Sequence, residues 1–515
     1  MSKVLGFYRS IACLLLLCCT RICGYANMPV TDFTVKGIYI DLRTQVMTVP
    51  ALKEVAGKAA AEGINTLIME YEATFPFDKH ATLCNAYHYT VEEITEFVQY
   101  CSSLGMDVIP LQNCFGHCEY ILRHDRYAKL RESKTDMSQV CPMNVKKAKS
   151  VFGELFKEVA RLHPSPYFHI GADETRLLGH CKSCKQKVDE EGISKLFVDY
   201  VKEMCELVIA MGKKPIIWAD MILQHPEALN ELPSEIIVVD WNYGWSPNHF
   251  GNVDALVERG LTVWGASALR SSPDNIYLTQ WNKHFENLET FLPFAREHGY
   301  EGIINTSWST SGRYGYIYDN DWEVVELQPI RQVYPMSGFD ILQRAYADAL
   351  KEGSRWDAKT FIRNYGKEHF GFADTGQVVL LEYMLMPQEK VTIAKMEDTQ
   401  ISQMLVQCET LRGKLAELEP TYHKEDWLHL QLMLDIRINY LKFKGVEKLV
   451  ESDGFNASMR QNYAAQLEQI EKESRDLCER FYRLNVAYLK NPAESFGKWD
   501  YVQKMQRMCR YLTLP

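Results

Sequence analysis

The sequence lacks a block of basic residues. Lys and Arg together number 57 against 67 Asp and Glu, which gives a formal net charge of -10. This argues against nucleic acid or an anionic membrane surface as a partner. A glycine-rich phosphate loop is also absent after the first apolar run, which weakens a nucleotide-binding interpretation. Hydrophobic content of 46% is ordinary for a globular protein, and 515 residues predict two or three domains.

The N-terminal segment has the composition of a secretory signal peptide. A lysine and an arginine precede an apolar run over residues 11–19, and small residues flank Tyr25. The run is too short to span a bilayer as a helix. We therefore expect cleavage after Ala26 and export to the periplasm or the extracellular space. A lipid-modified Cys18 is a disfavoured alternative, because Leu17 is bulky where such processing sites have a small residue.

The cysteines number 15, of which 11 remain once the signal peptide is removed. An odd number in an exported chain leaves at least one free thiol unless an intermolecular bridge forms. Cys181 and Cys184 lie next to His180 in a spacing compatible with zinc, but a structural site needs four ligands and no second pair follows. Three residues that could complete such a set are Cys114, His117 and Cys118. We favour a disulfide or free thiols, and expect no metal and no cofactor.

Between residues 27 and 350, short apolar runs alternate with amphipathic segments. The eight runs that we predict to be strands are residues 35–40, 64–69, 106–111, 167–170, 215–218, 236–239, 261–264 and 302–304. Helix-like segments include residues 50–62, 91–104, 145–162, 193–211 and 282–298. Eight strands that alternate with helices favour an α/β fold of the (β/α)8 TIM-barrel type over an open doubly wound sheet.

After residue 350 the strand pattern stops. Apolar residues recur in steps of three and four over residues 401–418, 427–441 and 463–484, which predicts three long helices in a bundle. A coiled-coil surface for a partner is an alternative, but the apolar stripes can pack against one another. The expected units are a signal peptide at 1–26, a barrel at 27–350 and a helical domain at 351–515.

Two adjacent carboxylates, Asp173 and Glu174, follow the fourth apolar run directly. Catalytic groups collect at the C-terminal ends of barrel strands, because the loops there vary while the barrel holds them. Two adjacent acids in a cleft repel each other when both are ionised. We therefore expect one of them to be protonated and to serve as a general acid. The same dipeptide at Asp189 and Glu190 is explained by acids in the first turn of a helix. His169 and the strand context distinguish the first pair.

Polar and aromatic residues follow the other apolar runs as well. Those expected to face the same cleft are Arg43, Glu70, Glu72, Asn113, Gly116, His117, His169, Trp218, Asp220, Trp241, Tyr243, Trp264 and Trp308. Each tryptophan alone is compatible with core packing. Together the four predict a pocket walled by flat apolar rings, which suits the C–H faces of a sugar while carboxylates and amides bind its hydroxyls.

Residues 169–174, His-Ile-Gly-Ala-Asp-Glu, resemble the His-x-Gly-Gly/Ala-Asp-Glu signature of glycoside hydrolase family 20, especially its hexosaminidase D-like branch. Similar motifs surround it in the same order, at residues 67–72, 75–76, 109–112, 115–119 and 178–184. The resemblance covers about residues 37–329. The C-terminal helices match only loosely.

This resemblance implies a retaining β-N-acetylhexosaminidase that removes terminal β-linked GlcNAc or GalNAc from glycans through substrate assistance, a known exception to the two-carboxylate scheme. Glu174 would protonate the glycosidic oxygen and later activate water. Asp173 would orient the 2-acetamido group, whose carbonyl oxygen attacks the anomeric carbon, and would stabilise the oxazolinium-like intermediate.

Three positions depart from the broader family pattern. Many members carry an Asp where this chain has Asn113, and the sugar-binding arginine after the first strand is offset at Arg43. The Glu commonly found two residues after the Trp308 position is missing, and Glu326 is a candidate replacement. Two other classes of function are compatible with the sequence: a lectin-like barrel that binds N-acetyl sugars without cleaving them, and a metal-dependent barrel hydrolase. Intact Asp173 and Glu174 count against the lectin.

Overall fold

The structure is a computed structural model that describes residues 32–271, 274, 278–309, 314–318, 325–329, 333–352, 355–492 and 500–514. The expected signal peptide lies outside these residues, so its cleavage and the export of the chain stay predictions. Among the helices of the described ranges, none combines the length and the apolarity needed to cross a membrane.

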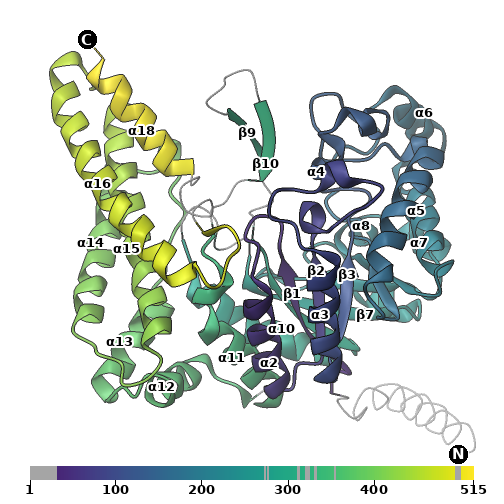
Figure 1. Cartoon of the computed structure of the whole chain (residues 1–515), viewed down its shortest axis with the longest axis horizontal. Helices are drawn as coiled ribbons and strands as arrows, with labels where there is room; N and C mark the ends of the chain where they lie inside the picture. Colours follow the sequence, from purple (N-terminus) through teal and green to yellow (C-terminus); the bar gives the residue numbers. More distant parts are fainter. Residues whose placement is uncertain are drawn as a thin grey trace, which may run out of the picture.

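Eight parallel strands close into a barrel in chain order, which confirms the predicted (β/α)8 fold (Figure 1). They are β1 (Val35–Asp41), β2 (Thr66–Glu70), β3 (Asp107–Leu111), β4 (Tyr167–His169), β5 (Lys214–Trp218), β6 (Ile237–Trp241), β7 (Thr262–Arg270) and β8 (Gly302–Ser307). Closure comes from β8, which pairs with β1 from Gly302 opposite Val35 to Ser307 opposite Ile40. The strands are buried on both faces, which explains their nearly continuous apolar runs.

Helices surround the barrel, and three of them begin at a residue whose side chain caps the first turn. The main ones are α2 (Val49–Ala61), α3 (Val91–Ser103), α5 (Val145–Arg161), α6 (Lys182–Glu191), α7 (Ile193–Ile209), α10 (Trp281–Glu297) and α11 (Asp340–Glu352). Shorter helices are α4 (Glu119–Leu122), α8 (Asp220–Gln224) and α9 (Asp254–Glu258). The three capped helices are α2, α3 and α6. Thr90 and Glu93 form a capping box at the start of α3, which satisfies two backbone N–H groups.

One detail of the helix prediction is wrong. Asp189 and Glu190 lie at the end of α6 and not in the first turn of a helix. The reason is that α6 and α7 are separate helices joined at Gly192, which adopts a φ of 90° between them.

The side chains that point into the barrel form an apolar cluster of their own. Its buried members are Tyr39, Ile68, Ile109, Leu111, Ile216, Trp218, Ile237, Val239, Trp264, Ala266 and Ile304. Trp264 is 0% exposed, and its ring meets that of Tyr167 at the start of β4 with centroids 5.5 Å apart. Its strand neighbour is Gly302, the first residue of β8. Trp264 therefore fills the end of the barrel where the strands begin.

The prediction that Trp264 lies at a strand end and walls the pocket is consequently wrong. The apolar run at 261–264 marks only the beginning of β7, which continues to Arg270. The strand continues through small residues, Gly265 to Ala268, which do not form an apolar run and therefore gave no strand signal in the sequence. The residue at the true end of β7 is Arg270, which is buried and donates to the carbonyl of Tyr334.

The C-terminal region is helical, as predicted, and Figure 1 shows it as a layer beside the barrel. Its helices are α12 (Ala358–Glu368), α13 (Asp374–Leu385), α14 (Asp398–Ala416), α15 (Lys424–Val450), α16 (Arg460–Asn485) and α18 (Asp500–Thr513). The predicted long helices correspond to α14, α15 and α16. The chain after α16 joins the barrel, where Lys490 N–H donates to the Val46 carbonyl at 2.7 Å. The domain boundary at residue 350 stays a prediction.

A two-stranded hairpin, β9 (Tyr314–Tyr318) and β10 (Val325–Pro329), follows β8 and was not predicted. In Figure 1 it stands off the end of the barrel. Glu326 lies in β10 with its backbone opposite Ile317. Its side chain is outside the described residues, so its role in hydroxyl binding stays a prediction.

Replacing Trp264 by Ala should destabilise the chain by about 3 to 5 kcal/mol, because a large ring is removed from a closed interior. Urea unfolding would measure the change. Trp245→Ala, which truncates a partly exposed ring, is the control and should cost much less. A Trp264→Ala loss below about 1 kcal/mol would contradict the assignment to the core.

Candidate active site

The C-terminal ends of the strands bring most of the predicted site residues together. The residues at this end are Arg43 after β1, Glu70 and Glu72 at β2, Asn113 and His117 after β3, Asp173 and Glu174 after β4, Trp218 and Asp220 at β5, Trp241 and Tyr243 at β6, and Trp308 after β8. The barrel thus gathers side chains that are far apart in the sequence.

The acid pair lies on a backbone turn that few residues adopt readily. After β4, Gly171, Ala172 and Glu174 have φ values of 73°, 70° and 45°. A Cβ at Gly171 would lie 2.0 Å from Asn113 Oδ1, so only glycine fits there. The turn is held by Trp218 N–H, which donates to the Gly171 carbonyl at 3.0 Å. Left-handed conformations at non-glycine residues are costly and cluster at functional sites.

His117 connects the two carboxylates. Its Nε2 lies 3.2 Å from Asp173 Oδ2 and 3.3 Å from Glu174 Oε2. Burial alone would lower the pKa of His117, but the charge of Asp173 and hydrogen bonds to both carboxylates outweigh it and raise this pKa well above its ordinary value. The imidazole is therefore cationic and donates to the acids. The other oxygen, Asp173 Oδ1, is buried and has no hydrogen-bond partner among the described residues.

The pKa of Glu174 favours its ionised form. Burial raises the pKa of Glu174, yet the hydrogen bond and charge of His117, together with Arg176, bring it below its ordinary value. Arg176 forms an ion pair with Glu174 Oε1. Glu174 is therefore not the protonated member of the pair, because the His117 imidazolium and Arg176 favour its carboxylate form.

Asp220 has the raised pKa instead. Burial and then the charge of Asp173 raise the pKa of Asp220 to about 7. Its Oδ2 accepts the Glu174 backbone N–H at 3.0 Å and its Oδ1 accepts Trp241 Nε1–H at 3.3 Å. Asp220 was predicted to bind substrate, and the structure shows that it orients the acid loop and one aromatic ring.

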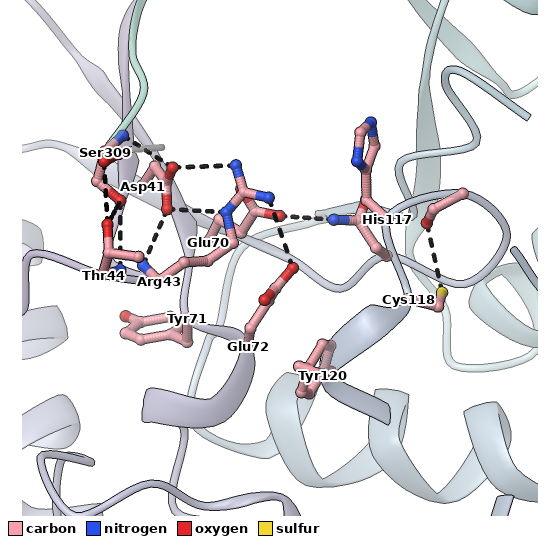
Figure 2. A network of polar contacts seen from close by, with 12 residues as sticks. Asp41, Arg43, Thr44, Glu70, Tyr71, Glu72, His117, Cys118, Tyr120 and Ser309 are labelled. Atoms are coloured by element: carbon pink, nitrogen blue, oxygen red, sulfur yellow. Dashed lines mark hydrogen bonds and ion pairs between the residues drawn. The ribbon is translucent and has the colours of Figure 1, made fainter. Parts of the chain in front are cut away.

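Arg43 lies among three buried carboxylates (Figure 2). Its Nε is 3.0 Å from Asp41 Oδ1 and 3.4 Å from Glu70 Oε2, and its Nη1 is 3.7 Å from Glu72 Oε1. Asn113 Nδ2 donates to Glu70 Oε1 at 2.5 Å. Burial raises the pKa of Glu70 to about 7 although Arg43 opposes the shift. Arg43, Glu72 and Asn113 therefore belong to one polar network at the cleft.

The network also joins the first and last strands of the barrel. Asp41 Oδ2 accepts the backbone N–H of Ser309 at 2.8 Å, and Thr44 Oγ1 donates to the Ser309 carbonyl at 3.0 Å. Figure 2 shows this link beside Arg43. The position of Arg43 is thereby fixed by two loops that meet where the barrel closes.

The aromatic rings of Trp218, Trp241, Tyr243 and Trp308 cluster at this end of the barrel. Trp308 Nε1–H donates to the Tyr243 hydroxyl at 2.9 Å, and the ring centroids of Trp218 and Trp308 are 5.9 Å apart. Trp241 meets Tyr243 with centroids 5.2 Å apart. Trp241 and Trp308 are partly exposed, whereas Trp218 is buried beneath them.

His169 does not face the cleft, so the prediction that it contacts substrate is wrong. It is 0% exposed and lies against the Trp218 ring, with centroids 4.5 Å apart. Its Nδ1 accepts the Gly171 N–H at 3.0 Å. Burial lowers the pKa of His169 to about 3, so the ring is neutral and can accept this bond. Through this hydrogen bond to Gly171, His169 supports the turn that carries Asp173 and Glu174.

Several site residues were missed by sequence reasoning. Trp245 and Phe250 extend the aromatic cluster beyond Trp241, with centroids 5.2 Å and 4.4 Å from its ring. The alternation Trp241, Tyr243, Trp245 was the signal that could have revealed Trp245. Arg176 gave no signal beyond its position two residues after Glu174.

Residues 42–307 match the family model described as "Glycosyl hydrolase family 20, catalytic domain". The chain belongs to this family and is a glycoside hydrolase, and the membership supports a β-N-acetylhexosaminidase activity. The hexosaminidase D of Bos taurus is 29% identical over 311 residues, which cover 57% of this chain and 87% of the bovine protein. That of Homo sapiens is 29% identical over 307 residues, which cover 56% of this chain and 62% of the human protein.

A solved structure with a similar fold is the chitobiase of Flavobacterium johnsoniae. Its TM-score is 0.51 at 16% sequence identity, and the match covers 94% of this chain and 73% of that one. At this identity the similarity concerns the fold.

Replacing Gly116 by Ala should reduce hydrolase activity about 10²-fold, the loss typical of a displacement near 1 Å in a catalytic group. The added Cβ would lie 2.3 Å from the Asp173 carbonyl oxygen and would push the acid turn away. Steady-state kinetics with circular dichroism would separate this effect from unfolding. Gly413→Ala in α14, where a Cβ meets nothing within 4 Å, should keep full activity. Undiminished activity of Gly116→Ala would refute the tight contact.

The raised pKa of Asp220 predicts that the difference in melting temperature between wild type and Asp220→Asn depends on pH. From about pH 4 to 7 the folded chain keeps a proton that the unfolded chain has released, so wild-type stability falls as pH rises, by at most about 1.4 kcal/mol per unit. The Asp220→Asn variant has no titrating group at this position, so its stability does not fall in this way. The melting temperature of Asp220→Asn minus that of wild type should therefore increase from pH 5 to pH 8. A constant or decreasing difference would contradict the raised pKa.

Proposed function

We propose that this glycoside hydrolase is a retaining exo-β-N-acetylhexosaminidase that removes terminal GlcNAc or GalNAc from glycans with the substrate's 2-acetamido group as the nucleophile. The observation that carries the proposal is the arrangement of Asp173 and Glu174, neighbours on one turn that share the nitrogen of His117. The relatives named above as hexosaminidases support the choice of sugar.

Because both acids contact one nitrogen of His117, we expect them to lie on one side of the substrate. A two-carboxylate retaining enzyme needs its nucleophile on the face opposite the general acid, with the two carboxyl groups flanking the scissile bond. Neighbouring residues that hydrogen-bond one nitrogen are poorly placed for opposite faces. An acetamido oxygen, which the substrate brings with it, removes the need for a protein nucleophile.

Asp173 is suited to hold the acetamido group. Its Oδ1 is buried without a partner among the described residues and can accept the acetamido N–H. This hydrogen bond orients the carbonyl oxygen toward the anomeric carbon. As the oxygen attacks and the glycosidic bond breaks, the carboxylate stabilises the positive charge that spreads over the new ring.

Glu174 donates the proton that the leaving oxygen needs. Since Glu174 is ionised before substrate binds, the proton has a nearby source in the His117 imidazolium, whose Nε2 lies 3.3 Å from Glu174 Oε2. Transfer leaves a neutral histidine and a protonated Glu174. After the leaving group departs, the carboxylate of Glu174 takes a proton from water, which opens the oxazolinium at the anomeric carbon with net retention.

The aromatic cluster and the Arg43 network are suited to the sugar itself. Partly exposed rings of Trp241 and Trp308 can pack on the C–H face of a pyranose. We expect Glu72 and Arg43, whose charged groups lie 3.7 Å apart, to offer polar contacts to the sugar hydroxyls.

Wild type should hydrolyse aryl β-N-acetylglucosaminides or galactosaminides and leave aryl β-glucosides nearly untouched, because only the former carry the nucleophile. Glu174→Gln should lower kcat/KM about 10²-fold or more for poor leaving groups and less for good ones. Asp173→Asn should lose activity on both, since it impairs formation of the ring. A series of aryl glycosides that differ in leaving-group pKa measures these effects.

The chain offers a matched control in its other Asp-Glu pair. Glu190→Gln alters an exposed residue of α6 and should leave all rates unchanged. Comparable turnover of a β-glucoside, or an equal effect of Glu174→Gln on good and poor leaving groups, would reject the mechanism.

A further inference from the structure

We propose that Glu132, Cys141, Cys181 and Cys184 form a structural zinc site that fastens the loop after the catalytic acids to the loop after β3. The four residues offer ligand atoms that all lie within 4.8 Å of one another. Glu132 and Cys141 lie between β3 and α5, whereas Cys181 is the N-cap of α6 and Cys184 lies in its first turn. The site lies outside the polar network of the cleft.

The distances between the sulfur atoms fit a tetrahedral ion. Cys141 Sγ lies 3.7 Å from Cys181 Sγ and 3.5 Å from Cys184 Sγ. A tetrahedron with Zn–S bonds of about 2.3 Å places its sulfur atoms about 3.8 Å apart. Cys184 Sγ is also 3.2 Å from Glu132 Oε2, which supplies an oxygen ligand as the fourth member. Thiolates favour zinc over the hard cations magnesium and calcium.

The buried carboxylate of Glu132 needs a positive charge nearby to compensate its own. Glu132 is 4% exposed, Cys141 3% and Cys184 0%. In the described part of the chain no cationic side chain forms an ion pair with Glu132. Its carboxylate accepts the Cys181 N–H at 2.7 Å and contacts the thiols of Cys184 and Cys141. Burying a carboxylate without a compensating charge raises the free energy of the folded state. A divalent cation with thiolate ligands supplies that charge.

A disulfide explains the cluster less completely. Three thiols cannot all pair with one another, so a bond between two of them leaves the third thiol and Glu132 buried beside it. Zinc uses all four groups. The C-x-x-C spacing also suits a metal, because Cys181 caps α6 and its Sγ accepts the Cys184 N–H at 3.4 Å. Two thiols at the start of a helix can then face one ion.

The ligand set differs from the one considered from the sequence. Cys114 and Cys118 donate to backbone carbonyls of Ile170 and Gly116, and His117 is engaged by the catalytic carboxylates. His180 is exposed and is not part of the cluster. The missing ligands are Glu132 and Cys141, which no spacing rule would have joined to Cys181 and Cys184.

The site would fix the polypeptide that carries Glu174. Cys181 follows Glu174 by only seven positions. Between them, Leu177 N–H donates to Gln139 Oε1 at 2.7 Å, so the same two loops are already in contact. Zinc would thus act by positioning the acid loop, without contact to the substrate.

The test is the metal content of the full chain, expressed in medium supplemented with zinc and purified without chelators. Inductively coupled plasma mass spectrometry should find about one zinc per chain, which Cys141→Ser and Cys184→Ser should lose. Glu132→Gln keeps three thiolates and should bind zinc more weakly. The matched control is Cys408→Ser, which alters a buried cysteine of α14 outside the cluster and should keep the metal.

Should the cysteine variants fail to fold, X-ray absorption of the wild type decides. We expect sulfur neighbours of zinc at about 2.3 Å and a lighter neighbour at about 2.0 to 2.2 Å. A wild type without zinc overturns the proposal, whether its intact mass is lower by the two hydrogens of a disulfide or all thiols are free. Zinc that is bound without sulfur neighbours also overturns it. These readouts do not depend on the proposed glycosidase mechanism.

Discussion

The cleft depends on one imidazolium that lies between two carboxylates. His117 reaches Asp173 and Glu174 through the same nitrogen, so acids whose charges would repel share one counter-charge. Without it, burial and repulsion would raise the pKa of one acid, as adjacency alone predicts. With it, raised carboxyl pKa values are found at neighbouring groups such as Asp220, Glu70 and Glu72. The histidine thereby sets both the geometry of the pair and the place where a proton is stored.

This arrangement requires left-handed backbone conformations at both His117 and Glu174. His117 has a φ of 52°, and Glu174 one of 45°. Such conformations persist only where surrounding contacts over-determine them. Here the Asp220 carboxylate holds the Glu174 N–H, and His169 holds the turn from below through Gly171. Residues expected to touch the sugar, His169 and Asp220, are therefore better understood as supports that keep a strained loop in place.

The sequence predicted the barrel because its strands are buried on both faces and so read as apolar runs. It located the acid pair for the same reason, since Asp173 and Glu174 directly follow one of these runs. It failed at β7, where small residues continue the strand beyond Trp264 without any apolar pattern. It also failed on the protonation of Glu174, because that depends on His117 from another strand. Periodicity locates elements, whereas charge compensation depends on which loops meet in space.

The loop after β4 has to be rigid for a reason that follows from its strain. One end of the acid turn is fixed by the barrel, but loops at this end of a barrel are otherwise the most mobile part of the fold. A turn that is costly in free energy would relax if its other end were loose. The contacts of Leu177 with Gln139 and of Cys181 with Glu132 provide that second anchor. An ion bound by the thiols next to Glu132 would reinforce this second anchor and so support the geometry of Glu174 without contact to the substrate.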